Sequence, residues 1–378
     1  MAAGADPCLP VTLVAGLAEA QKTALVAHLL ARPGRLRVHA VRQTVARELT
    51  STGSGTLCED LLAHARRTAG KADALVVQLP GGVEPRTVSE ALADLSEVAL
   101  AVRVDTVVTV VDVTTLLTDV HSDALLSDWR LALGRDDDRA LAEVLIAQVE
   151  HADVVVVARW ERVPVPTVAR AEALLRTLNP CARLVRAQYG RVSPALVVST
   201  GRYDPDRVPA GWAVALAGFD LPDCGEGVSH LTYRARRPFH PLRLSETLAD
   251  PFDGLIRSKG FLWLATRPAL ALLWDQAGPV LTLERARTWM ADRPASAWVD
   301  LDPFARMELE ATWDPYYGDR QQELVFIGVE MDTAAISRAL DACLLTDLEL
   351  SAGEPAWRAL PDPFPPWEHG AAVTEGWK

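Results

Sequence analysis

The chain has 378 residues, of which 49% are hydrophobic and 23% charged, and its formal net charge is -12. This composition is typical of a soluble globular protein with enough apolar residues for two domains. The negative charge argues against a general nucleic-acid coat or free DNA as a partner, because phosphate binding requires a clustered basic surface. A local patch such as Arg234, Arg236 and Arg237 leaves docking on a ribonucleoprotein open.

The cysteines and the N-terminal sequence indicate the cellular compartment of the protein. Five cysteines are scattered along the chain, with no two at metal-chelate spacing, which is typical of reduced thiols in the cytosol. No apolar run approaches the ~20 residues of a membrane span. The opening MAAGADPCLP has neither a basic region nor a long apolar region, so we expect no export signal. We therefore expect a cytoplasmic protein without a membrane partner.

The first 200 residues alternate short apolar runs with amphipathic stretches. Val11–Ala15 is a β-branched run that ends at Gly16, and Lys22–Leu30 has helical spacing. Three further apolar runs predict buried strands, at 74–79, 106–111 and 153–158. Four amphipathic stretches predict helices, at 59–67, 86–95, 140–151 and 169–178. This alternation favours an α/β domain with a parallel sheet covered on both faces, over residues 1–200.

The pattern changes after Thr200. Residues 201–227 are rich in Gly, Pro and Asp and predict a linker. Beyond it, strands are expected at 230–236, 261–264 and 323–329, and helices at 242–248 and 333–344. These elements predict a smaller α+β domain over 228–350. Residues 351–378 form a tail whose segment PDPFPPWEHG is proline-rich and expected to be extended or mobile.

One motif near the N-terminus resembles a phosphate-binding loop. A phosphate-binding loop needs G-x-x-x-x-G-K-[ST] between a strand and a helix, and the chain offers Gly16-Leu-Ala-Glu-Ala-Gln21-Lys22-Thr23 there. Gln21 replaces the second glycine, and Glu19 adds a negative charge to a loop meant for phosphate. The loop binds nucleotide weakly on one interpretation. On the other, Lys22 and Thr23 are ordinary first-turn residues of a helix.

Further segments match one family in order. PVTLVAGLAEAQKTALVAHLL resembles the opening of CobW-like P-loop GTPases, whose loop reads G-F-L-G-S-G-K-T-T-L. The ordered matches continue at 56–62 (TLCEDLL), 78–85 (QLPGGVEP), 107–112 (VVTVVD) and 148–161 (QVEHADVVVVARWE). The resemblance implies a P-loop NTPase-type domain that binds GTP with Mg²⁺, at Gly16, Lys22, Thr23, Gly81 and Asp112.

The chain departs from the family at the positions that bind metal and read guanine. Thr52, Gly53, Ser54 and Gly55 replace the family's C-x-C-C, and hydroxyls and glycines are not zinc ligands, so we expect no stable zinc site. Cys58 is an isolated thiol. At the guanine-reading N-K-x-D, residues 158–161 read Ala-Arg-Trp-Glu, which leaves Glu161 as the one acid.

Catalysis has little support from the sequence. Gln78 stands where the family has an acid, and an amide cannot ionise. The catalytic residues therefore stay unassigned, and hydrolysis stays open.

The C-terminal half resembles the CobW C-terminal domain at 236–244, 254–268, 274–278, 318–328 and 339–349. Within it, a polar partner surface is one interpretation of His240, Arg243, Arg257, Lys259 and Arg320. The alternative is that the cations pair with the acidic surface and that His240 is a turn residue. The 11 tryptophans fall mostly in this half, where they serve a docking face or the core.

Together these features resemble a divergent branch of the family. The resemblance implies a zinc-starvation factor that recruits a ribosome hibernation factor to the ribosome, with vestigial nucleotide binding. A GTP-dependent zinc metallochaperone is the alternative, and a metal-insertion helper for nitrile hydratase or cobalamin is a third. Both alternatives require an intact nucleotide motor.

Overall fold

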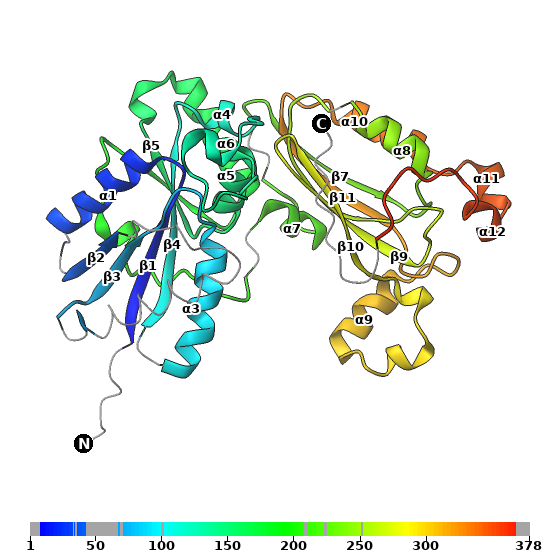
Figure 1. Cartoon of the computed structure of the whole chain (residues 1–378), viewed down its shortest axis with the longest axis horizontal. Coiled ribbons are helices and arrows are strands. Elements are labelled where there is room, and N and C mark those ends of the chain that lie inside the picture. Colours follow the sequence, from blue (N-terminus) through cyan, green and yellow to red (C-terminus); the bar gives the residue numbers. More distant parts are fainter. Residues whose placement is uncertain are drawn as a thin grey trace. The chain divides into compact units, whose positions relative to one another are not determined.

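The computed structural model describes residues 8–32, 34, 36–42, 67–68, 71–99, 102–207, 210–222, 225–250 and 252–367. The chain divides into two compact units (Figure 1). The N-terminal unit comprises Met1–Val214 and Leu221–Glu226, and the C-terminal unit comprises Ala215–Asp220 and Gly227–Lys378. Positions 52–55, Cys58 and most of the helix predicted at 59–67 lie outside the described residues.

A six-stranded parallel sheet forms the centre of the N-terminal unit. Its strand order is β2-β3-β1-β4-β5-β6. The strands are β1 (Leu9–Ala15), β2 (Val38–Arg42), β3 (Ala74–Gln78), β4 (Val102–Asp112), β5 (Val154–Ala158) and β6 (Arg183–Ala187). Val-rich runs give β1, β3, β4 and β5 their buried character, because a parallel sheet is covered on both faces. This confirms the predicted α/β fold.

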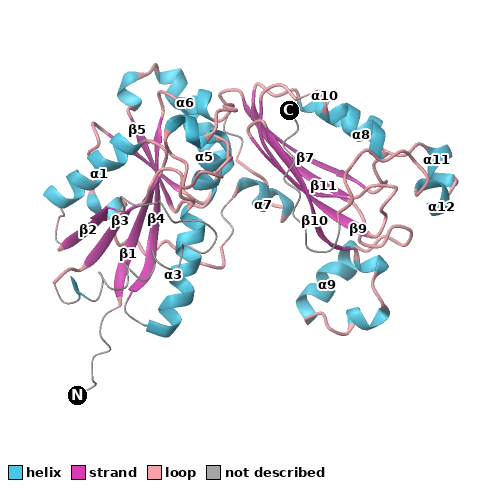
Figure 2. Cartoon of the chain, in the orientation of Figure 1, coloured by secondary structure: helices cyan, strands magenta, loops and turns pink. Residues whose placement is uncertain are grey.

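Helices cover both faces of this sheet (Figure 2). They are α1 (Glu19–Ala31), α3 (Pro85–Ala99), α4 (Leu116–Asp119), α5 (Leu141–Glu150) and α6 (Val165–Leu178). The short helix α7 (Gly211–Leu216) crosses the boundary between the units. Alternation along β1 sends Leu13 into a core cluster with Val88 of α3, and Val14 into another with Leu25 of α1. The 3₁₀ turn η1 (Leu126–Trp129) follows α4, and the 3₁₀ turn η2 (Trp160–Arg162) follows β5.

The C-terminal unit is built on a five-stranded antiparallel sheet of order β10-β9-β8-β11-β7. Its strands are β7 (Val228–Ala235), β8 (Leu255–Leu262), β9 (Leu270–Ala277), β10 (Val280–Thr288) and β11 (Gln322–Val329). Its helices are α8 (Pro241–Leu248), α9 (Pro303–Thr312), α10 (Thr333–Cys343), α11 (Asp347–Ser351) and α12 (Glu354–Trp357). The predicted α+β domain is confirmed, with β9 and β10 as strands that the sequence analysis missed.

Aromatic side chains dominate the core of this second unit. Trp263, Trp274 and Trp289 are among the largest fully buried side chains. Trp274 contacts Phe326 of β11 edge to face, at 6.1 Å between ring centroids. Trp274 and Phe326 belong to the core cluster that packs the sheet against α8 and α10, whereas Trp263 and Trp289 belong to a second cluster with Trp357.

Residues 361–367, in the tail, follow an irregular path but pack against this core. Phe364 and Trp367 are buried, and the indole of Trp367 donates a hydrogen bond to the Leu283 carbonyl at 3.0 Å. Arg267 donates to the carbonyls of Phe364 and Pro365, and its guanidinium lies 4.5 Å from the Trp367 ring centroid. None of the helices in the described ranges combines the length and apolar character needed to cross a membrane.

Candidate nucleotide-binding site

The predicted phosphate loop lies between β1 and α1, as its sequence context requires. Gly16 has a φ of +126°, which L side chains rarely adopt. A Cβ at this position would lie 2.3 Å from the Val110 carbonyl oxygen of β4. Glycine is therefore required here for the loop to turn over the sheet.

Lys22, the lysine of the loop, donates hydrogen bonds to a main-chain carbonyl and to a carboxylate of the protein itself. The Lys22 side chain is fully buried, and its ammonium group donates to the Leu79 carbonyl oxygen at 2.7 Å. It also donates to Glu19 Oε1 at 2.8 Å. Since a phosphate-loop lysine holds phosphate oxygens, the Glu19 carboxylate takes the place of an anionic ligand beside Lys22.

Gln78 extends this network to the predicted Mg²⁺ ligand. Its amide Nε2 donates to Glu19 Oε2 at 3.3 Å and to Thr23 Oγ1 at 3.2 Å. Thr23 is the residue whose hydroxyl binds Mg²⁺ in such loops. Lys22, Thr23 and Gln78 thus lie together in one hydrogen-bond network, and Glu19 joins them.

The turn that carries Gly81 is fixed by residues that the sequence analysis did not single out. Gln148 of α5 donates to the Gly81 carbonyl at 2.7 Å and to the Val83 carbonyl at 2.9 Å. Arg139 donates to the Gly82 carbonyl at 3.0 Å. A Cβ on Gly81 would lie 3.2 Å from Glu19 Oε1, so this turn adjoins the loop. In the sequence, a glutamine within a largely apolar helical stretch was the signal that could have identified Gln148 as a functional residue.

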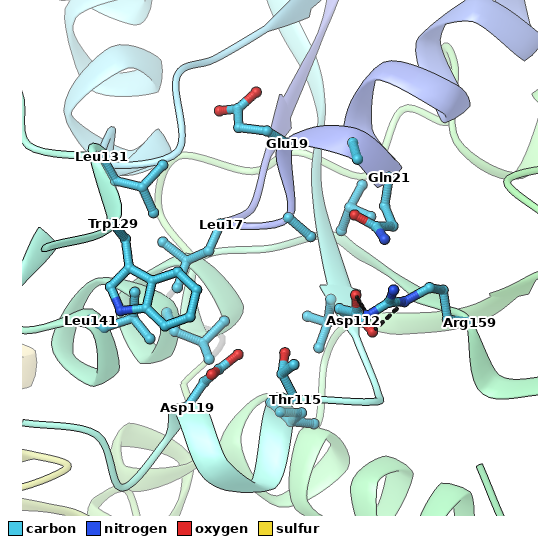
Figure 3. A pocket seen from close by; sticks show the side chains of 16 residues that line it. Leu17, Glu19, Gln21, Asp112, Thr115, Asp119, Trp129, Leu131, Leu141 and Arg159 are labelled. Carbon is cyan, nitrogen blue, oxygen red and sulfur yellow. Dashed lines mark hydrogen bonds and ion pairs between the residues drawn. The ribbon is translucent and has the colours of Figure 1, made fainter. Parts of the chain in front are cut away.

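Asp112 lies at the end of β4 and pairs with Arg159, as Figure 3 shows. The ion pair has an N–O distance of 2.6 Å, and Asp112 Oδ1 also accepts from the Thr114 amide at 3.0 Å. Arg159 has a left-handed backbone conformation, with a φ of +57°. The aspartate is therefore engaged by the arginine that replaces the family's guanine-reading residue.

Two pockets adjoin the loop. The larger one, of about 370 Å³, lies between the loop, the end of β4 and α4, and Leu17, Trp129 and Leu141 give it apolar walls (Figure 3). The smaller one, of about 170 Å³, lies between Gln21, Glu161 and Tyr189. In the smaller pocket, Glu161 Oε2 is buried and accepts no hydrogen bond from the residues that the structure describes.

The larger pocket has an acidic lining. Glu19, Asp112 and Asp119 line it together with Arg159, and Arg159 is paired with Asp112. Burial raises the pKa of Asp119 above its ordinary value. A nucleoside triphosphate with Mg²⁺ does not fit the phosphate end of the site while Glu19 holds Lys22.

The five residues predicted as a partner surface are mostly engaged in ion pairs. Arg243 binds Glu349 in bidentate fashion, at 2.8 Å for both contacts. Arg257 and Lys259 share Asp275, and Arg320 pairs with Asp292 at 2.8 Å. These contacts favour the alternative that the cations pair with acids, and the partner surface stays a prediction.

His240 caps the start of α8, in the turn that the sequence suggested. Burial lowers the pKa of its imidazole below the ordinary value, and Nδ1 makes no hydrogen bond within the described structure. Its place in this turn agrees with the interpretation as a turn residue.

Two family models match the chain. The model of the CobW/HypB/UreG nucleotide-binding domain matches residues 42–186, and that of the cobalamin synthesis protein CobW C-terminal domain matches residues 228–344. The two matches fall on the parallel sheet and on the antiparallel sheet respectively.

Curated relatives match over most of their length. The zinc-regulated GTPase metalloprotein activator 1 of Dictyostelium discoideum is 34% identical over 323 residues, covering 82% of this chain and 68% of that protein. A zinc chaperone of Mycobacterium tuberculosis is 32% identical over 403 residues, covering 95% of this chain and 93% of that protein. The crystal structure of the zinc-bound YjiA GTPase from E. coli aligns at 17% identity with a TM-score of 0.40, over 89% of this chain and 99% of that one.

Proposed function

Because the chain belongs to the CobW/HypB/UreG family, we propose that it is a cytoplasmic protein of zinc homeostasis, of the zinc-chaperone type, whose phosphate loop is gated by its own Glu19. The names of the two curated relatives support the zinc-related part of this proposal. The contact between Glu19 and the buried Lys22 carries the gating part.

The gate is the Glu19 side chain in its contact with Lys22, and we infer it from the hydrogen-bond partners of the loop. Lys22 donates to Leu79 and Glu19, and Gln78 donates to Glu19 and Thr23. An incoming phosphate carries more negative charge than one carboxylate, but it must displace Glu19 before it reaches Lys22. The Glu19 side chain is 46% exposed, so it can swing into solvent without disrupting the core. We therefore expect GTP and Mg²⁺ to bind weakly while the gate is closed.

A titration of the purified full chain with fluorescent GTP and Mg²⁺ tests the gate. We expect Glu19→Ala to tighten binding by at least about tenfold, because it removes a like charge from the phosphate position. Lys22→Ala should abolish binding in both backgrounds. Glu90→Ala is the matched control, since Glu90 is an exposed helical glutamate that pairs with Arg86 at 2.7 Å.

Either of two results would overturn the gate. One is wild-type affinity in Glu19→Ala. The other is tight, Lys22-dependent binding of GTP by the wild-type protein, which would mean that Glu19 presents no obstacle.

Recruitment of a ribosome hibernation factor is the second candidate function. The sequence Thr-Gly-Ser-Gly at 52–55 favours it, because these residues offer no thiolate or imidazole for zinc cargo. A protein without its own metal ligands fits a role of docking a partner when zinc is scarce. On this candidate, the ribosome and the hibernation factor are the partners.

Zinc titration against a chelating dye separates the two candidates. Stoichiometric zinc that resists the chelator would support the zinc-chaperone type. Binding no tighter than about micromolar, together with co-sedimentation of the protein with ribosomes and the hibernation factor, would support the recruiter.

A further inference from the structure

Helix α9 lies in a lobe of the C-terminal unit that projects away from α8 and α10 (Figure 1). Asp302 caps the helix and accepts from the amides of Phe304 and Ala305, at 3.0 Å each. Trp298 and Trp313 contact each other across the lobe, at 5.1 Å between ring centroids. The lobe is thus an ordered structure with its own aromatic contact.

The apolar side chains of α9 face solvent. Phe304 is 64% exposed and Met307 is 58% exposed, and Ala311 is exposed one turn further along. Residues at i, i+3 and i+7 share one stripe of a helix. The inner side, with Ala305 and Leu309, is only partly buried. An amphipathic surface helix normally turns its large apolar side chains inward, so this stripe lacks the cover that such residues usually have.

The same segment is strongly acidic. Residues 299–314 contain Asp300, Asp302, Glu308, Glu310 and Asp314, with Arg306 as their one cation. Arg306 is paired with Glu310 at 2.9 Å. The segment that carries the apolar stripe therefore has more carboxylates than its single cation, Arg306, can neutralise.

We propose that the exposed stripe of α9 is a docking surface for a basic amphipathic helix of a partner protein. Apolar side chains of the partner would pack on Phe304 and Met307, as helices pair through i, i+3 and i+4 positions. Lysine or arginine side chains beside them would pair with Asp300, since Glu310 is already paired with Arg306. Anionic lipid and nucleic acid are disfavoured by the charge of this segment, and a second copy of the chain would bring like charges together.

A binding titration with a defined probe tests this surface. The probe is a labelled helical peptide of Leu and Lys with an apolar stripe, and the control peptide has the same composition in scrambled order. We expect the full chain to bind the probe, and high salt to weaken binding, because the charge pairs are exposed. The double variant Phe304→Ser/Met307→Ser should lose at least about tenfold in affinity. Leu348→Ser, at a position 81% exposed elsewhere in the same unit, should bind as wild type.

A charge variant supplies an independent readout. Asp300→Lys should weaken binding at low salt and have little effect at high salt, because screening removes the long-range attraction. Both positions of the double variant are exposed, and a thermal melt like that of the wild type verifies that it folds.

Three results would overturn the proposal. They are no binding of the probe by the wild-type chain, equal binding of the scrambled peptide, and unchanged binding in the double variant. A dimer in sedimentation that the double variant abolishes would assign the stripe to a second copy, and it would also overturn the proposal.

Discussion

Lys22 and Leu79 are joined by a hydrogen bond of 2.7 Å between a fully buried ammonium group and a main-chain carbonyl, across 57 residues of sequence. The bond ties the first turn of α1 to the chain just after β3. A lysine that phosphate loops use for ligand binding thus has a structural role here.

The first prediction concerns the stability that this bond provides. Lys22→Met keeps the apolar stem but leaves the Leu79 carbonyl without the ammonium donor. We expect the free energy of unfolding to fall by about 1–3 kcal/mol, the cost of an unsatisfied buried acceptor. Urea denaturation measures it, with Lys71→Met at an exposed position as the control. A stability equal to that of the wild type would show that the bond is dispensable.

The second prediction concerns Asp275, which lies between Arg257 and Lys259. The Arg257 side chain is only 4% exposed, so its charge depends on that carboxylate. We expect Asp275→Asn to lower the free energy of unfolding by about 3 kcal/mol, since it breaks a buried ion pair from one side. Asp73→Asn, which breaks the exposed pair with Arg37, should have little effect. Equal effects of the two variants in chemical denaturation would contradict this.

The third prediction is a pH dependence set by His151. Burial lowers the pKa of this imidazole from 6.5 to about 4. Between these two values the unfolded chain binds a proton that the folded chain does not. Stability is therefore fully present above pH 6.5 and falls as the pH falls toward 4, by about 3 kcal/mol at most.

Denaturation at a series of pH values measures this slope. His151→Gln should flatten it between pH 4 and 6.5. Ser89→Ala, which removes only the hydroxyl 2.8 Å from His151 Nε2, should retain it, because burial is the main cause of the shift. A His151→Gln variant with the wild-type slope would assign the dependence to other groups.

The fourth prediction concerns residues 361–367. Arg267 holds this segment through the Phe364 and Pro365 carbonyls and the carboxylate of Asp362. We expect Arg267→Ala to raise amide hydrogen exchange across the segment, because three anchors are lost together. Arg358→Ala, which removes a half-exposed arginine paired with Glu354, is the control. Unchanged protection would mean that Phe364 and Trp367 hold the segment without Arg267.

The sequence predicted the central strands better than the edge strands, for a physical reason. β3 and β5 are buried along their whole length, and their residues are all apolar except Gln78 at the end of β3. β2 and β6 lie at the edges of the sheet, and β6 interrupts its apolar residues with Arg183 and Arg186. β9 and β10 are partly exposed and mix Asp, Gln, Glu and Arg with apolar residues, so no clean alternation marks them.

The candidate site shows a similar limit. The loop motif predicted the positions of Gly16, Lys22 and Thr23, because local sequence sets a strand, a turn and a helix. The partners of Lys22 and Thr23 depend on Leu79 and Gln78, which are more than 50 residues away. The conflict between Glu19 and phosphate was visible in the sequence, but its contact with Lys22 required the fold. The pairing of Arg159 with Asp112 likewise needs two neighbouring strand ends.

The burial of Trp263, Trp274 and Trp289 gives the molecule an intrinsic optical probe. Indoles excluded from water emit at shorter wavelengths than exposed ones, so the blue edge of the emission spectrum should report the integrity of the C-terminal sheet. Trp129, which is 59% exposed and lines the larger pocket of the N-terminal unit, should emit at the red edge. Loss of the blue-edge emission therefore reports unfolding of the second sheet, and a Trp129→Phe variant identifies the part of the red edge that comes from the pocket beside the phosphate loop.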